Sequence, residues 1–463
     1  MKSHAQIAVI GAGPAGLAAA TKASSQGADV ILFDEQPAPG GQIYRAVESA
    51  TAAQKKVLGT SYARGEGLVR ALRESSVDYR PASTIWQLTA EREIGVSRDG
   101  AAGIVTADRV IVAGGAIERP FPIPGWTLPG VATAGAAQIL LKSSGLVSEG
   151  AIFAGSGPLL YLVVSQYLRA GLRPAALIDT TPRSNRWPAL KKFAAALKRW
   201  DLLVEGAGWM REIRQASIRV ERAASDLAIE GSDHAEAIVF HDGHGKPQRI
   251  TGDRIFLHQG VVPNVNLTMS AGCRHHWNDR QLCWVPDVDR WYGSSLPGIS
   301  IIGDGAGIAG AVAAEAAGRI AAIGVLQELG YSDAPTADKQ SEPHRRKLAQ
   351  ENAIRPFLDL WFRPNDAHRI PDRPETIVCR CEEVTAGDLR QGIALGAPGP
   401  NQLKAFCRAG MGPCQGRMCG LTVTELLAAE TGKDPEAVGY YRLRPPVKPL
   451  TLGELAALPI SKE

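Results

Sequence analysis

The sequence predicts an α/β fold with two dinucleotide-binding units, followed by a small helical domain that carries clustered cysteines. Two glycine-rich turns, each between a short apolar strand and a helix, predict the two units. Four cysteines in two close pairs near the end of the chain predict the last domain. The 463 residues, of which 45% are hydrophobic, are enough for several buried cores.

Bulk composition excludes several classes of protein. The chain has 51 Lys and Arg against 47 Asp and Glu, and this net charge of +4 does not favour nucleic acid as a partner. The longest apolar stretch, residues 299–326, is interrupted by charged side chains and does not predict a transmembrane segment. No targeting segment is recognised, and no cysteine precedes Cys273, unlike in a secreted disulfide framework. We expect a cytoplasmic protein.

The start of the chain predicts a dinucleotide site. A short apolar strand enters the turn Gly11-Ala-Gly13-Pro-Ala-Gly16, a helix follows, and a second strand ends at Asp34 and Glu35. Gly11 permits a tight turn, Gly13 lets a pyrophosphate approach the backbone, and Gly16 lets the helix pack closely on the strand. The acid 18 residues after Gly16 is placed to accept a ribose hydroxyl.

Three further segments indicate FAD as the dinucleotide. Residues 37–42 resemble the Gly-Gly segment beside the flavin in two-dinucleotide-binding flavoproteins, the glutathione and thioredoxin reductase superfamily. Residues 109–116 resemble the strand beneath the cofactor, and residues 298–305 resemble the late Gly-Asp motif. The resemblance implies that Asp304 binds the ribitol, with an ordinary helix cap as the alternative. The expected FAD contacts are Gly11, Gly13, Pro14, Ala15, Gly16, Asp34, Glu35, Gly41, Gln42, Ala113, Gly114, Gly303 and Asp304.

Residues 151–179 repeat the order of strand, glycine turn, helix, strand and acid. Gly155-Ser-Gly-Pro-Leu-Leu160 forms the turn and Asp179 is the acid. In the superfamily this unit binds NAD(P)H. Leu160 stands where a glycine or small residue normally lets the helix close on the strand, so the helix must shift and spoil the phosphate cradle. We therefore favour a domain kept for structure, or for another nucleotide, over a working NAD(P)H site.

Reactive side chains are sparse in this nucleotide-binding part. Nine residues separate Cys273 from Cys283, so they do not form the CxxC or CxxxxC pair of the superfamily's disulfide reductases. They are expected to be incidental buried thiols. His258 and the pair His275-His276 are expected to be solvated or satisfied histidines in loops. No residue is assigned as a catalytic acid or base.

Residues 331–373 predict a polar connection. Five prolines and many charged side chains interrupt this segment. Within it, Ile354, Phe357, Leu358 and Trp361 recur at helical spacing. This pattern predicts one helix that docks on a neighbouring surface.

The second strong motif is a cysteine pattern. Cys379 and Cys381 are followed, after 32 further residues, by Cys414 and Cys419. Two close pairs of thiolates suit a soft metal, but the spacing fits neither a zinc ribbon nor the common ferredoxin runs. It resembles the bacterioferritin-associated-ferredoxin module, a small helical domain that holds a 2Fe–2S cluster. Zinc and four structural thiols are the alternatives, and Cys407 is expected to be a non-ligand.

Local features around the cysteines agree with a cluster. Thr385 and Asp388 predict a capping box that opens a helix ending near Gly396. Cys419 is expected in the first turn of a helix over residues 417–431, whose positive end favours a thiolate. Four basic side chains are expected to offset the negative charge of a cysteine-bound cluster: Arg380, Lys404, Arg408 and Arg417.

Nearly the whole chain resembles the α subunits of dye-linked amino-acid dehydrogenases. These include opine oxidases, D-hydroxyproline and L-proline dehydrogenases, and the flavoprotein–ferredoxin subunit of hydrogen cyanide synthase. The resemblance implies that the substrate is oxidised on the FAD of a separate β subunit related to D-amino-acid oxidases, often with a small ferredoxin-like γ subunit. This chain would then pass electrons toward a quinone or dye.

Two other functions stay open. The chain could be a stand-alone NAD(P)H-dependent flavin reductase, or a non-enzymatic iron-sensing or docking protein.

The motifs divide the chain into six segments. The expected segments are 1–145 and 291–330 as two parts of an FAD domain, 146–290 as an NAD-like domain, 331–373 as a linker, 374–435 as the 2Fe–2S domain and 436–463 as a tail.

Overall fold

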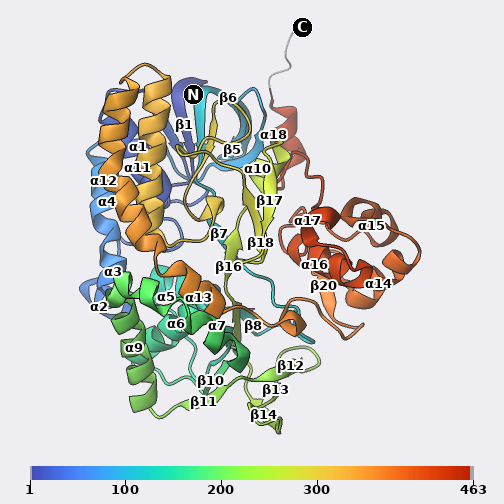
Figure 1. The fold of residues 1–463 in the computed structure, drawn as a ribbon. Helices are drawn as coiled ribbons and strands as arrows, with labels where there is room; N and C mark the ends of the chain where they lie inside the picture. The colour runs from blue at the N-terminus through green and yellow to red at the C-terminus, as the bar shows by residue number, and fades with distance from the viewer. Residues whose placement is uncertain (1–2, 459–463) are drawn as a thin grey trace.

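The computed structural model describes residues 3–458 and shows two sheet-based units beside a smaller C-terminal lobe (Figure 1). The strands of the first unit are β1 (His4–Ile10), β2 (Val30–Phe33), β3 (Asp78–Arg80), β4 (Thr84–Leu88), β5 (Glu93–Arg98), β6 (Ala101–Val112) and β19 (Ile299–Ile301). They form one sheet in the order β3-β2-β1-β6-β5-β4, and β19 adds to β6. The pairs among β3, β2, β1, β6 and β19 are parallel, so the carboxyl ends of β1, β2 and β19 meet at one edge.

Helices α1 (Pro14–Ser24) and α11 (Ala311–Glu328) pack against each other beside this sheet. Their approach requires a glycine, because a Cβ at Gly318 would lie 2.1 Å from the carbonyl oxygen of Ala15. Helix α12 (Ala334–Asn352) covers α11 from the outside (Figure 1). The N-terminus of α1 is thereby fixed at the edge where the strands end.

The second unit is built on a parallel sheet with the strand order β11-β10-β9-β15-β8. The strands are β8 (Val131–Thr133), β9 (Ile152–Ser156), β10 (Ala176–Asp179), β11 (Arg219–Arg222) and β15 (Ile255–Gln259). Its helices are α5 (Ala134–Ser144), α6 (Pro158–Arg169) and α9 (Trp200–Gln215). β8 and α5 precede residue 146, the expected start of this unit, because β8 pairs with β15.

Smaller strands and helices extend the two units or connect them. The strands are β12 (Ser225–Glu230), β13 (Ala237–His241) and β14 (Pro247–Thr251) in one antiparallel sheet, β7 (Ala116–Glu118) with β16 (Val261–Pro263), and the hairpin of β17 (His275–Asn278) and β18 (Cys283–Pro286). The helices are α2 (Ala52–Leu58), α3 (Thr60–Ala63), α4 (Gly65–Arg73), α7 (Arg186–Leu190), α8 (Phe193–Ala196) and α10 (Asn266–Ser270). The 3-10 turns are η1 (Arg183–Asn185), η2 (Leu197–Arg199), η3 (Gly303–Ala306) and η4 (Asp366–His368).

The linker is more helical than the sequence predicted. Its first half forms α12, which begins where the Asp333 side chain accepts a 2.9 Å hydrogen bond from the Thr336 backbone N–H. Pro343 lies inside this helix, and that proline led to the expectation of an irregular segment. The predicted docking helix is present as α13 (Arg355–Trp361), which buries Phe357 against α7 and α8.

The C-terminal lobe is small and mostly helical. It contains the strands β20 (Ile377–Cys379) and β21 (Val384–Thr385) and the helices α14 (Ala386–Ala394), α15 (Pro400–Cys407) and α16 (Gly420–Thr431). The predicted capping box is confirmed, since Thr385 and Asp388 exchange hydrogen bonds at the start of α14. Cys419 is the N-cap residue of α16 and not part of its first turn.

Buried contacts hold this lobe against the rest of the molecule. The Trp126 indole donates a 2.7 Å hydrogen bond to the carbonyl oxygen of Ile377. Glu425 on α16 forms ion pairs with Arg369 and Arg119, and all three side chains are buried. Buried ion pairs of this kind cost desolvation but fix geometry, so the lobe has one defined position beside the hairpin β17–β18 (Figure 1).

The C-terminal segment returns to the first unit. It begins with α17 (Pro435–Val438), which still packs on α16 of the lobe, and ends with α18 (Leu452–Ala456). Between them, the Val447 N–H donates a 2.9 Å hydrogen bond to the Trp86 carbonyl oxygen. The chain therefore crosses from the first unit to the lobe and back.

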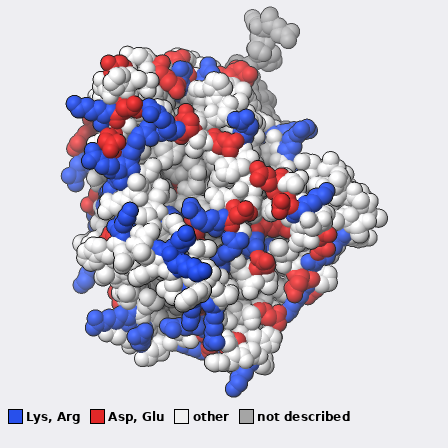
Figure 2. Space-filling view, viewed as in Figure 1, with Lys and Arg blue, Asp and Glu red and all other residues white. Residues whose placement is uncertain are grey.

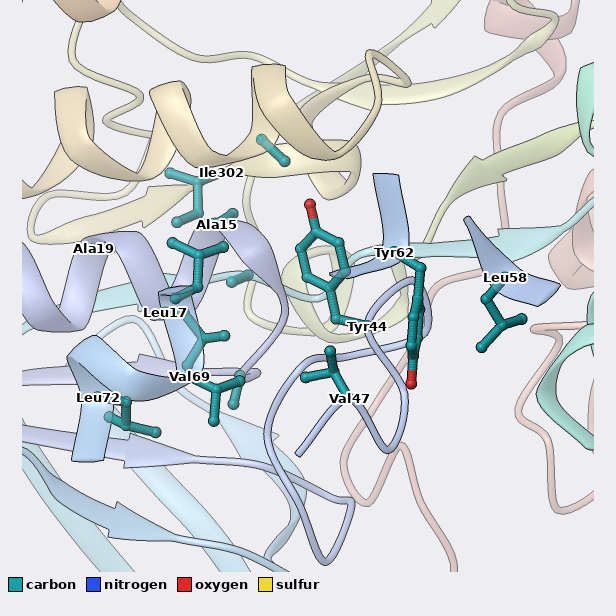
Figure 3. Packing of buried hydrophobic residues seen from close by; sticks show 14 of the residues in the cluster. Ala15, Leu17, Ala19, Tyr44, Val47, Leu58, Tyr62, Val69, Leu72 and Ile302 are labelled. Carbon is teal, nitrogen blue, oxygen red and sulfur yellow. The ribbon is translucent and has the colours of Figure 1, made fainter. Parts of the chain in front are cut away.

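Tyrosine and aliphatic side chains form the core below the first glycine turn. Tyr44, Val47 and Tyr62 belong to the same buried cluster as Leu17 of α1 (Figure 3). The outer surface carries charges of both signs, since blue and red side chains both occur on the face shown in Figure 2. Among residues 3–458, no helix combines the length and the apolar character that crossing a bilayer needs.

Candidate functional site

Glycines in the first glycine turn let neighbouring backbone segments pack closely together. Gly11 has a φ of +103°, and a Cβ there would lie 2.5 Å from the Ala113 carbonyl oxygen. A Cβ at Gly16 would lie 1.8 Å from the Gly11 carbonyl oxygen, so α1 closes on β1 only because this residue is glycine. The roles predicted for Gly11 and Gly16 in chain packing agree with these distances. Gly13 is the N-cap of α1, whose N-terminal N–H groups point toward the turn.

Several of the other expected FAD contacts lie close to the same turn. A Cβ at Gly41 would lie 2.8 Å from the Cα of Gly13, and one at Gly303 would lie 2.8 Å from the Cβ of Ala15. The sheet brings four distant segments to one edge, because β1, β2, β6 and β19 end there. The structure therefore brings these predicted residues together, although they come from both ends of the nucleotide-binding part of the chain.

The two acids after β2 have different surroundings. Asp34 is buried, and its Oδ2 and Oδ1 accept hydrogen bonds of 3.1 and 3.0 Å from the backbone N–H groups of Ala12 and Gln36. Burial raises the pKa of Asp34. Glu35 instead points outward to the Lys448 ammonium group. Asp34 thus holds the backbone of the first glycine turn in place. The sequence alone does not show which of two adjacent acids has this role.

Asp304 accepts hydrogen bonds from the backbone of the turn that precedes α11. Its Oδ1 accepts hydrogen bonds from the backbone N–H groups of Ala309 and Gly310, at 2.9 and 3.0 Å. Gly310 is the N-cap of α11. This bonding orders the turn before α11, and it does not test a contact with a ribitol.

One buried lysine beside the cradle was missed. Lys142 on α5 is 3% exposed, and its Nζ donates hydrogen bonds to the Gln42 carbonyl oxygen at 3.1 Å and to Gln138 Oε1 at 2.8 Å. Burial lowers the pKa of Lys142 to about 7. In the sequence, the only indication of this burial is that Lys142 lies on the inner side of a helix rich in Leu and Ala.

The second glycine turn is closed by the chain itself. Leu160 is fully buried in the core between α6 and its neighbours. Asp179 Oδ2 accepts a 2.7 Å hydrogen bond from the Tyr161 hydroxyl, and Oδ1 accepts one of 2.9 Å from the Thr181 N–H. The acid expected to meet a ribose is therefore already engaged by protein groups.

The linker covers this second turn. The Phe362 carbonyl oxygen lies 3.5 Å from the Ser156 hydroxyl, and the Asn185 amide donates to the Arg363 carbonyl oxygen at 2.8 Å. These bonds hold the segment after α13 over the place where a nucleotide would approach. The expectation that this unit is not a working NAD(P)H site gains support from both features.

The histidines considered above lie on strands, not in loops. His258 is on β15 and is buried, with its Nδ1 2.7 Å from Glu118 Oε1. His275 and His276 begin β17, and burial lowers the pKa of His275 to about 4. The expected loop position was wrong for His275 and His276, which lie on the strand β17 of a hairpin. Each is satisfied by a protein partner, as expected.

The four motif cysteines form two pairs that cross the sequence pairs. The Cys379 thiol lies next to that of Cys419, and the Cys381 thiol lies next to that of Cys414. The Cys419 thiol lowers the pKa of Cys379 to about 6, whereas the same contact and burial raise the pKa of Cys419. Cys407 donates instead to the Leu403 carbonyl oxygen on its own helix, at 3.3 Å.

The four thiols do not form an assembled metal site in the described part of the chain. Within residues 3–458, no three His, Cys, Asp or Glu side chains converge as one metal ion would need. A glycine makes one pair possible, since a Cβ at Gly412 would lie 2.3 Å from the Cβ of Cys381. Arg408, expected to offset cluster charge, forms a 2.9 Å ion pair with Glu382. The cluster ligands remain a prediction.

Comparisons with known proteins give the family. The family model described as Pyridine nucleotide-disulphide oxidoreductase matches residues 5–318, and that described as Sarcosine oxidase A3 domain matches residues 373–458. The opine oxidase A-subunit of Rhizobium meliloti is 43% identical over 99% of this chain and 88% of the relative. The opine oxidase A-subunit of Agrobacterium tumefaciens (strain Ach5) is 44% identical over 97% of this chain and 91% of the relative.

The chain belongs to the family of opine oxidase A-subunits. Among solved structures, L-proline dehydrogenase from P. horikoshii matches with a TM-score of 0.73 and 19% identity, over 98% of this chain and 80% of that chain. That likeness confirms the predicted fold, and the family confirms the predicted resemblance. A member of this oxidoreductase family is one subunit of a larger enzyme, so a partner subunit is implied.

Proposed function

We propose that this chain is the electron-transferring subunit of a heteromeric dye-linked dehydrogenase that oxidises an opine, such as octopine or nopaline, or D-hydroxyproline. It would bind FAD and a 2Fe–2S cluster and pass electrons from the FAD of a β subunit related to D-amino-acid oxidases to a quinone or dye. A small ferredoxin-like γ subunit completes the proposed complex, which we place in the cytoplasm.

The residues of the first turn fit FAD. Gly13 and Gly41 lie close together and have no side chains. The backbone is therefore accessible at the place where a pyrophosphate would lie. Asp34 is fixed by two backbone donors beneath this place, and α1 directs its N-terminal end toward it. Family membership supports the same cofactor, because the matching family model is that of a flavoprotein fold.

The four thiols fit a two-iron cluster better than one ion. Thiolate sulfur is the ligand that Fe–S clusters take, and two separated pairs would give each iron two ligands. Cys419 is fully buried, whereas Cys381 is exposed. A group held between them would face the protein interior on one side and solvent on the other. The crossed pairing of these four cysteines is the observation that carries the proposal.

The exposed side of the lobe fits contact with a partner subunit. Leu395, Phe406 and Met411 are 65%, 51% and 47% exposed there, and the right-hand lobe in Figure 2 carries broad white areas. When bound, a flavin exchanges electrons singly or in pairs and an iron–sulfur cluster exchanges them singly. A chain that holds both can link a two-electron oxidation to one-electron acceptors.

Iron and sulfide analysis tests this proposal. Wild-type protein purified without oxygen should contain about two iron and two acid-labile sulfide per chain. The Cys381→Ser variant should lose most of this iron, whereas Cys407→Ser should keep it, because the Cys407 thiol donates its hydrogen bond to the Leu403 carbonyl oxygen of its own helix. Zinc in place of iron, or equal loss in both variants, would contradict the proposed ligand set.

A further inference from the structure

Tyr441 places its hydroxyl group against a proposed ligand sulfur. The hydroxyl oxygen lies 3.7 Å from Cys419 Sγ, and both side chains are buried. Among the described residues, this sulfur is the hydrogen-bond partner of the hydroxyl. A thiolate that ligates iron carries no proton, so the tyrosine must be the donor. A buried hydroxyl that lost this acceptor would be left unsatisfied.

Two glycines of the cysteine motif fix the tyrosine ring in this position. A Cβ at Gly410 or at Gly416 would lie 2.5 Å from a carbon of the Tyr441 ring. Both glycines also have positive φ angles, of +83° and +75°. The Lys404 ammonium group lies 4.5 Å from the ring centroid, on a ring face. The ring therefore fills a slot made by the loop that carries Cys414.

We propose that Tyr441 is a positioning residue that raises the reduction potential of the cluster by donating a hydrogen bond to Cys419 Sγ. Hydrogen bonds to ligand sulfurs are among the main determinants of the potential of an iron–sulfur cluster. A donor stabilises the more negative reduced state, because that state places more charge on sulfur. This inference rests on the 2Fe–2S cluster of the proposed function.

The neighbouring tyrosine supplies a matched control. The Tyr440 hydroxyl donates a 3.3 Å hydrogen bond to the Gly416 carbonyl oxygen, and its ring lies 5.7 Å from that of Tyr441. Tyr440 thus lies beside the same loop, but its hydroxyl group bonds to a carbonyl oxygen and not to a sulfur atom. Replacing each tyrosine by phenylalanine removes one hydroxyl and keeps the ring that fills the core.

A redox titration followed by electron paramagnetic resonance tests the proposal on the full chain. In Tyr441→Phe, the ratio of oxidised to reduced cluster at a given potential should rise about tenfold, a fall of about 59 mV for a one-electron couple. Tyr440→Phe should leave the midpoint unchanged. A Tyr441→Phe midpoint equal to that of the wild type, or equal shifts in both variants, would overturn the proposal.

A second substitution decides the question if Tyr441→Phe fails to keep its cluster. Site-specific 3-fluorotyrosine at position 441 has nearly the same shape but a more acidic hydroxyl, so it should donate more strongly and raise the midpoint. A lower or unchanged midpoint would overturn the proposal. A wild-type chain without iron would instead contradict the proposed function, so the two failures are distinguishable.

Discussion

Lys448, near the end of the chain, pairs with both carboxylate oxygens of Glu35, with its Nζ 2.8 Å from Oε1 and 2.9 Å from Oε2. Glu35 directly follows the buried Asp34, whose oxygens are bound by the cradle backbone. Glu35 therefore holds the C-terminal segment against the first unit, whereas Asp34 holds the backbone of the first glycine turn.

These different roles predict different effects on FAD binding. Asp34→Asn has one acceptor oxygen for two backbone N–H groups, so one buried donor loses its partner, at a cost of about 1–3 kcal/mol. We expect FAD affinity to fall about tenfold or more. Glu35→Gln breaks a half-exposed ion pair, and we expect a change of about threefold or less. Flavin fluorescence after equilibrium dialysis measures both, and equal losses would contradict this assignment.

The contact of Gly16 with Gly11 predicts the effect of one added methyl group. In Gly16→Ala the Cβ would lie 1.8 Å from the Gly11 carbonyl oxygen, so α1 must move away from β1. We expect loss of bound FAD and a destabilisation of about 3 kcal/mol. Gly67→Ala in α4 is the control, because no atom lies within 4 Å of its added Cβ. A stable, flavin-loaded Gly16→Ala protein would contradict the cradle geometry.

His368 predicts an acid-sensitive stability. Its ring is buried, neither nitrogen has a hydrogen-bond partner within residues 3–458, and burial lowers its pKa from 6.5 to about 4. Between these two pH values the unfolded chain binds the proton and the folded chain does not, so stability falls as pH drops below 6.5. The contribution of His368 to this loss should be about 2 kcal/mol at pH 5 relative to pH 7.

The matching variant is His368→Phe, which keeps a ring beside Phe121. Urea unfolding at pH 7 and pH 5 should show a smaller pH effect in this variant than in the wild type. His244→Gln, at an exposed position, should retain the wild-type pH effect. The same pH dependence in His368→Phe and wild type would show that another group is responsible.

The closed second turn predicts that NADH does not reduce this chain directly. Tyr161 engages Asp179, and the Phe362 backbone covers Ser156. Under anaerobic stopped-flow mixing, NADH and NADPH should leave the flavin absorbance unchanged over seconds. Rapid bleaching would favour the alternative of a stand-alone NAD(P)H-dependent reductase.

Local sequence rules predicted the parts of the fold that backbone geometry dictates. Gly11 and Gly16 could be assigned from their motif, since a side chain at either position would meet backbone atoms. The Thr385 capping box was equally local. By contrast, α12 was missed because Pro343 and the polar side chains of this segment favoured an irregular connection over a helix.

The features that were missed depend on contacts between distant residues. Lys142 meets Gln42 across 100 residues, and Tyr441 meets Cys419 from beyond the expected domain limit. The crossed pairing of the cysteines likewise follows from how the loops fold, because the same spacing permits either pairing. Spacing identified the ligand candidates, and packing determined their neighbours.

The number of electrons that one chain accepts tests the central claim most directly. Anaerobic titration of the purified wild-type chain with dithionite should consume about three electrons, two for FAD and one for a 2Fe–2S cluster. The absorbance of both groups should bleach as the titration proceeds. An end point at about two electrons per fully flavin-loaded chain would mean that the four cysteines hold no redox-active cluster, and would contradict the proposed electron-transfer role.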